Sequence, residues 1–89
     1  MRYEKECKEI GELALKQLNL EKNKIKERFE DLSYSKIFSL LREEVSELRD
    51  ELAEYQINKV SNKKRILEEL GDCVAVLVGM YAAVQDELE

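Results

Sequence analysis

Apolar residues recur every three or four positions along two long stretches of this chain, residues 36–57 and 63–87, and no proline interrupts either stretch. This spacing places the apolar side chains on one face of a helix. A third stretch, residues 2–18, has the same spacing, in Tyr3, Cys7, Ile10, Ala14 and Leu18. Residues 19–34 leave open whether they form a helix or a loop. We therefore predict an all-α protein with three helices.

The segment between the second and third helices is short. Residues 58–62 form it, and Ser61 or Asn62 can cap the helix that follows, as Ser33 or Ser35 can cap the second helix. A connector of this length favours an antiparallel helical hairpin. With 89 residues the chain is long enough for one domain, so we assign residues 1–89 to a single all-α domain made of the hairpin and the N-terminal helix.

The third helix has no charged residue from Cys73 to Gln85, on any face. A helix that is apolar all round is normally buried all round, and one antiparallel neighbour cannot cover it. We therefore expect either a dimer interface or a larger bundle.

The charge and composition exclude several classes of function. The formal net charge is -5, which disfavours nonspecific binding to nucleic acid or to an anionic membrane. The chain has no histidine, so histidine triads and imidazole zinc sites are excluded. The uncharged run at residues 73–85 is too short to span a bilayer. The N-terminus lacks a secretory signal pattern, and Cys7 and Cys73 have no metal-type spacing, so we expect a reduced, cytoplasmic protein.

Four carboxylates lie on or beside the apolar faces of the two hairpin helices. At about 100° per residue, Glu44 falls between two leucines of the apolar arc and Glu47 falls at its border. Glu69 and Asp72 adjoin the apolar arc of the third helix. Buried like charges repel one another and are costly to desolvate. A hard divalent cation, Mg²⁺ or Mn²⁺, would satisfy a set of oxygen ligands of this density.

The acidic residues also form a recognisable pattern. "EEVSE", residues 43–47, is followed after 21 residues by "ELGD", residues 69–72. This resembles the EExxE…ExxD signature of the MazG-like all-α nucleoside triphosphate pyrophosphohydrolases, and the apolar framing in "LLREEVSEL" and "ILEELGDCVAVLVGM" agrees with it. The resemblance covers about residues 36–82.

The resemblance implies magnesium-dependent hydrolysis of a nucleoside triphosphate to the monophosphate and pyrophosphate, for nucleotide-pool housekeeping. It implies that Glu44, Glu47, Glu69 and Asp72 bind the metal, and that Glu43 orients the attacking water. Glu43 or Glu47 would accept the proton of that water. It also implies a homodimer or homotetramer in which the helices complete a four-helix-type bundle across subunits.

The phosphate groups of such a substrate need cationic or backbone N–H partners. The connector and the start of the third helix supply a cluster of basic residues: Lys59, Lys63, Lys64 and Arg65. Each of these residues could instead be an ordinary surface residue that contacts only water. Many members of the family continue into a further basic segment, whereas this sequence stops at Glu89. Lys36, Arg42 or a partner subunit is therefore the other expected source of positive charge for the phosphate groups.

Three alternatives remain open. Phosphoribosyl-ATP pyrophosphohydrolase has the same acidic pattern, but its usual histidine after ExxD is absent here. A helical protein-interaction module would carry the acids only as surface residues, although Glu44 and Glu69 interrupt its apolar stripes. A protein that binds metal or nucleotide without turnover would need the same ligands.

Overall fold

The chain folds into three helices in the computed structural model, which describes residues 2–20, 33–58 and 62–88, without the side chains of residues 58 and 86–88. The helices are α1 (Glu4–Asn19), α3 (Tyr34–Asn58) and α4 (Lys63–Leu88). No strand occurs within these described ranges. The prediction of an all-α chain is confirmed, and each predicted end lies within two residues of the observed one. Residues 21–32 and the connector residues 59–61 lie outside the described part.

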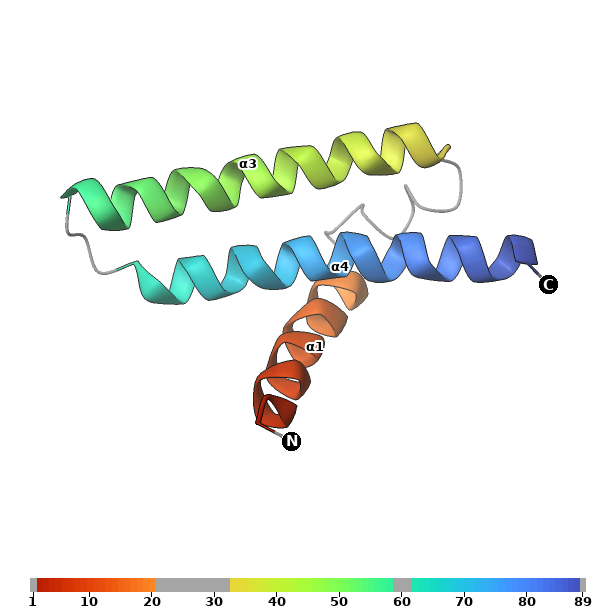
Figure 1. The fold of residues 1–89 in the computed structure, drawn as a ribbon, viewed down its shortest axis with the longest axis horizontal. Coiled ribbons are helices and arrows are strands. Elements are labelled where there is room, and N and C mark those ends of the chain that lie inside the picture. Colours follow the sequence, from red (N-terminus) through yellow and green to blue (C-terminus); the bar gives the residue numbers. More distant parts are fainter. Residues whose placement is uncertain (1, 21–32, 59–61, 89) are drawn as a thin grey trace.

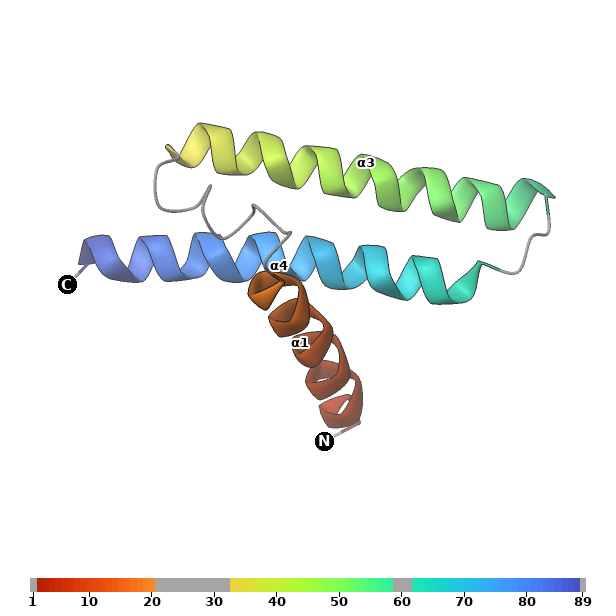
Figure 2. The ribbon, with the colours of Figure 1, turned by 180° about the vertical axis from the view of Figure 1, so that it is seen from behind.

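Helices α3 and α4 lie side by side and run in opposite directions, which confirms the predicted hairpin (Figure 1). The C-terminal part of α1 meets α4 near the middle of α4, and the rest of α1 extends away from the hairpin, as the view from behind also shows (Figure 2). Helix α4 therefore contacts both of the others and is the central element of the fold. Of the described helices, none combines the length and apolar character needed to cross a membrane.

Helix α3 begins two residues earlier than predicted because Ser33 occupies the N-cap position. Its carbonyl oxygen accepts hydrogen bonds from the backbone N–H groups of Lys36 and Ile37, both at 3.0 Å. The Ser33 hydroxyl lies 3.2 Å from that of Ser35. The two backbone bonds begin the hydrogen-bonding pattern of α3 at Ser33 and so set where the helix starts relative to the acidic residues that follow.

The hydrophobic core lies between the N-terminal half of α3 and the C-terminal half of α4. Its buried members are Ile37, Leu40 and Val76, and the half-buried Leu18, Leu41 and Met80 pack against them. Helix α1 reaches this core through only part of the predicted apolar face: Ala14 is buried and Leu18 half-buried, whereas Tyr3 and Cys7 are exposed. The core thus ends before the middle of the hairpin, where the carboxylates begin.

Candidate metal centre

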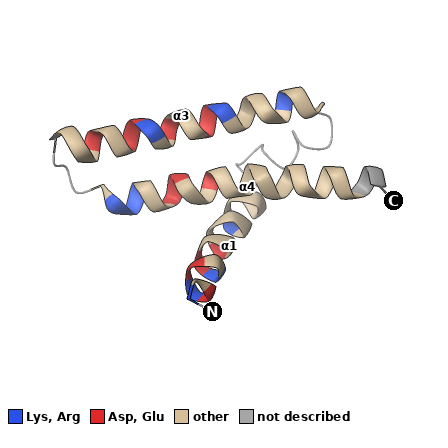
Figure 3. Ribbon diagram, viewed as in Figure 1, with Lys and Arg blue, Asp and Glu red and all other residues tan. Residues whose placement is uncertain are grey.

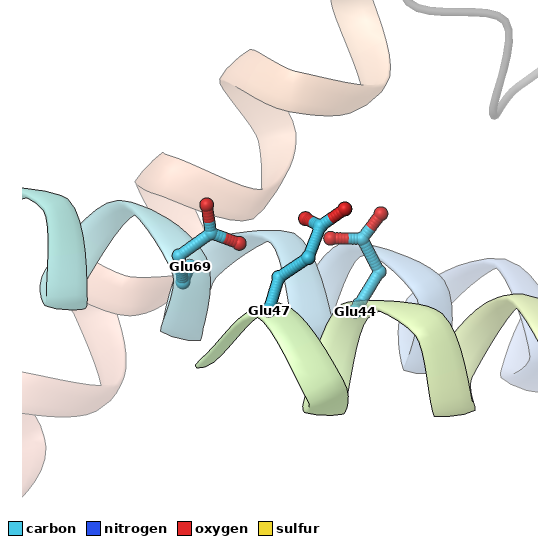
Figure 4. A group of neighbouring side chains, drawn as sticks. All are labelled: Glu44, Glu47 and Glu69. Atoms are coloured by element: carbon cyan, nitrogen blue, oxygen red, sulfur yellow. The ribbon is translucent and has the colours of Figure 1, made fainter. Parts of the chain in front are cut away.

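Three glutamates meet between α3 and α4 at the middle of the hairpin. Glu44 and Glu47 project from α3, and Glu69 projects from α4 toward them (Figure 4). One carboxylate oxygen from each lies within 4.8 Å of the others. Spacing of three residues puts Glu44 and Glu47 on one side of α3, and the antiparallel packing brings Glu69 to that side. The group is one that could hold a metal ion.

Asp72 lies one turn along α4 from Glu69 and belongs to the same electrostatic group. Its charge is close enough to raise the pKa of both Glu44 and Glu69. It is half-buried, and the main cause that raises its own pKa is burial, followed by the charges of Glu47 and Glu68. The structure therefore brings the four predicted metal ligands into mutual electrostatic range, although Asp72 is outside the tight three-glutamate group.

Several of these carboxylate oxygens are buried without a hydrogen-bond partner. They are Oε2 of Glu44, Oε2 of Glu69 and Oδ1 of Asp72. Buried polar atoms are almost always hydrogen-bonded, because an unpartnered one bears its full desolvation cost. Three such atoms lie on neighbouring carboxylates, so the group could accept contacts from a ligand that supplies positive charge or hydrogen-bond donors.

The raised pKa values of the group also show that its negative charges lie close together without compensation. Burial, and then the charges of Glu47, Asp72 and Glu69, raise the pKa of Glu44 from 4.5 to about 7. Burial, and then Asp72 and Glu47, raise the pKa of Glu69 from 4.5 to about 7. Within the described residues, no lysine or arginine forms an ion pair with any of the four carboxylates. No basic side chain of this part of the chain therefore offsets the raised pKa values of Glu44 and Glu69.

Glu43 occupies a different position. It is exposed, and with Ser39, Arg42 and Ser46 it lines a shallow hollow on α3. It is not one of the three glutamates whose oxygens converge. Its predicted role, orienting water beside the metal site, stays a prediction.

The predicted phosphate-binding residues begin α4. Lys63, Lys64 and Arg65 are exposed there, and the basic first turn is followed by the acidic residues of the site (Figure 3). Arg65 pairs with Glu51, with 3.0 Å between Nη2 and Oε1. Lys59 lies outside the described residues.

Sequence reasoning missed a contact network at the end of the hairpin. Asn62 was expected to cap α4, and it does stand at the N-cap position, where its carbonyl oxygen accepts a hydrogen bond from the N–H of Ile66 at 3.0 Å. Its side chain, however, makes no capping bond and instead donates to Glu51 on α3. The position of Glu51, one turn after Glu47, was the available signal, since it falls on the helix face that carries Glu44.

The donor set has a clear chemical preference. Carboxylate oxygens are the ligands of hard divalent cations, so the group fits Mg²⁺ or Mn²⁺ better than a metal that prefers thiolate or imidazole. Cys73 is buried beside the group, and burial followed by the neighbouring carboxylates raises the pKa of its thiol, which disfavours the thiolate that a soft metal needs. Comparison of the chain with models of protein families, with curated proteins and with solved structures found no match.

Proposed function

We propose that this protein is a magnesium-dependent nucleoside triphosphate pyrophosphohydrolase, which converts the triphosphate to the monophosphate and pyrophosphate. The observation that carries the proposal is the set of buried, unpartnered carboxylate oxygens on Glu44, Glu69 and Asp72, gathered beside Glu47 between two antiparallel helices. The EExxE…ExxD pattern of the sequence supports the choice of reaction, because it places acids at these same positions.

Glu44, Glu47, Glu69 and Asp72 would hold the ion, which when bound would neutralise phosphate charge and lower the pKa of a coordinated water. Of the four, Glu47 is the most exposed, so it is both a ligand and the best-placed proton acceptor for an attacking water. Glu43, the other candidate base, faces solvent on α3. Lys63 and Lys64, exposed at the start of α4, are the candidate contacts to the phosphates.

We infer that the functional unit is a homodimer or homotetramer. Several large apolar residues of α4 remain uncovered: Leu67, Leu77, Val78, Tyr81 and Val84. Tyr81 is 66% exposed and Leu77 48% exposed, although each lies in a helix that has no charge from Cys73 to Gln85. The radius of gyration, 14.3 Å, exceeds the value of about 12 Å expected for a compact domain of this length. A second copy packed on α4 would cover this surface and complete a four-helix-type bundle.

The test is release of pyrophosphate from a panel of ribo- and deoxynucleoside triphosphates, with magnesium and with a chelator. Glu69→Gln is the site variant, and Asp50→Asn is its matched control because Asp50 is an exposed acid of α3 whose ion pair is with the neighbouring Arg49. We expect magnesium-dependent release that Glu69→Gln abolishes and Asp50→Asn retains.

The opposite result is equally specific. No release from any nucleotide, by a folded protein, would overturn the catalytic proposal. If magnesium still raised the melting temperature of that protein, a metal- or nucleotide-binding module without turnover would be the better description.

A further inference from the structure

Three residues join the end of α3 to the start of α4, and we call them the hairpin junction: Glu51, Asn62 and Arg65. The Nδ2 group of Asn62 donates hydrogen bonds to Oε2 of Glu51 at 2.7 Å and to its backbone carbonyl oxygen at 2.9 Å. Arg65 approaches the other carboxylate oxygen, Oε1, at 3.0 Å. Both oxygens of Glu51 are thus engaged by groups from the opposite helix.

The hairpin junction lies one helical turn from the metal centre on each of the two helices. Glu51 follows Glu47 by one turn of α3, and Arg65 precedes Glu69 by one turn of α4. Because the helices are antiparallel, the contact that joins Glu51 to Arg65 is the next step of the alignment that brings Glu47 to Glu69. A change in this contact would therefore change the alignment of the ligand pairs.

We propose that Asn62 and Arg65, acting through Glu51, are positioning residues that set the magnesium affinity of the carboxylate site. They fix the axial register of the two ligand-bearing helices. They also keep a fifth carboxylate, that of Glu51, out of the ligand group. This inference rests on the proposed metal-dependent function, whose residues it does not itself include.

The burial of the junction indicates that it is an ordered contact and not a surface pair. Asn62 is 7% exposed and the side chain of Glu51 is 16% exposed. A buried amide that donates to a carboxylate makes a short, strong hydrogen bond, and its loss leaves a buried acceptor unsatisfied. Arg65 itself is 71% exposed, so its charge contributes less than the amide does.

Glu51 differs from the neighbouring carboxylates in the partners of its oxygens. Oxygens of Glu44, Glu69 and Asp72 are buried without partners, whereas both oxygens of Glu51 have them. Without the junction, the carboxylate of Glu51 would be free to turn toward Glu69, to which it is already close enough to interact electrostatically. A site with an additional, mobile carboxylate would have a less defined ligand geometry.

The experiment is a titration of the melting temperature with magnesium alone, on the full chain, alongside pyrophosphate release. We call the magnesium concentration that raises the melting temperature by a fixed amount the midpoint, because stabilisation by a ligand at concentration L grows as RT ln(1 + L/Kd) without a plateau. Asn62→Asp is the test variant, because aspartate has nearly the shape of asparagine but replaces the amide donor by a charge that repels Glu51. We expect the midpoint to rise about tenfold, with turnover at saturating magnesium unchanged. Asp50→Asn, which removes a neighbouring charge of α3 outside the junction, should leave the midpoint unchanged.

The double variant Asn62→Asp with Glu51→Gln separates positioning from general stability. It exchanges the positions of the amide and the carboxylate and keeps the net charge of the junction. The magnesium midpoint should therefore return toward that of the wild type. An unchanged midpoint in Asn62→Asp, or no recovery in the double variant, would overturn the proposal. Should Asn62→Asp not fold, Arg65→Gln takes its place, with a smaller rise expected because Arg65 is more exposed than Asn62.

Failure of the proposed function would give a different pattern. If magnesium raises the melting temperature but no nucleotide releases pyrophosphate, catalysis is refuted while the midpoints still test the junction. If magnesium has no effect on the wild-type melting temperature, there is no site to position, and both proposals are overturned.

Discussion

Gly71 lies where α1 packs on α4, and replacing it with alanine tests this contact. A Cβ atom at Gly71 would lie 2.9 Å from Cβ of Leu13. Carbon atoms in contact are normally about 3.5–4.0 Å apart, and Cβ of Leu13 is fixed to its backbone, so α1 would have to move. Overpacking of this kind costs about 1–3 kcal/mol, whereas alanine gains about 1 kcal/mol over glycine within a helix. We expect Gly71→Ala to lower the free energy of unfolding by up to about 2 kcal/mol.

Gly11 provides the matched control, because it lies in α1 and a Cβ there would have no neighbour within 4 Å. Gly11→Ala should therefore show only the gain in helix propensity, about 1 kcal/mol, which corresponds to about 4–8 °C in melting temperature for a domain of this size. Thermal unfolding followed by circular dichroism compares the two variants. A melting temperature for Gly71→Ala that rises as much as that of Gly11→Ala would refute the packing of Leu13 against Gly71.

Three further predictions concern the site and the exposed apolar surface. The pKa values of Glu44 and Glu69 are raised to about 7, so the metal-free protein should lose stability as the pH rises from about 4.5 through 7, by about 1–2 kcal/mol after solvent screening. Thermal unfolding in chelator measures this loss, and Glu69→Gln should reduce it; a melting temperature that rises over this range would contradict the assignment. Glu43→Gln should lower the rate of pyrophosphate release without changing the magnesium midpoint, and a shifted midpoint would make Glu43 a ligand. Replacing Leu77 and Tyr81 with glutamate should reduce the oligomer to the monomer in sedimentation, and an unchanged mass would locate the interface elsewhere.

The helices could be predicted because their signals are local. Apolar periodicity without proline identified all three, and a short connector was enough to predict the hairpin. The crossing of α1 over α4 could not be predicted, because it depends on the close approach of Leu13 to Gly71, two residues far apart in the sequence. The first turn of α3 was misplaced by two residues, since its start depends on which serine supplies the N-cap.

The site could be predicted in part because helical spacing is also a local signal. Helical spacing showed that Glu44 and Glu69 adjoin apolar faces, and the structure half-buries both. The engagement of Glu51 by Asn62 and Arg65 was not predictable, because it depends on the axial register of two helices and not on the spacing within either one. Spacing indicated only that Glu51 faces inward with Glu44, and the structure half-buries it, but spacing could not identify its partners.

The arrangement along the hairpin explains how the acidic group can exist without the proposed cation. At one end Ile37, Leu40 and Val76 form an apolar core, and at the other end Asn62 holds Glu51. Between these two contacts lie carboxylates that repel one another and would push the helices apart. Because both ends are held, burial and then the mutual repulsion raise the pKa of the carboxylates without separating α3 from α4. Part of the ordering that a ligand would otherwise have to impose is thus already present, which favours tight binding of a cation at the centre.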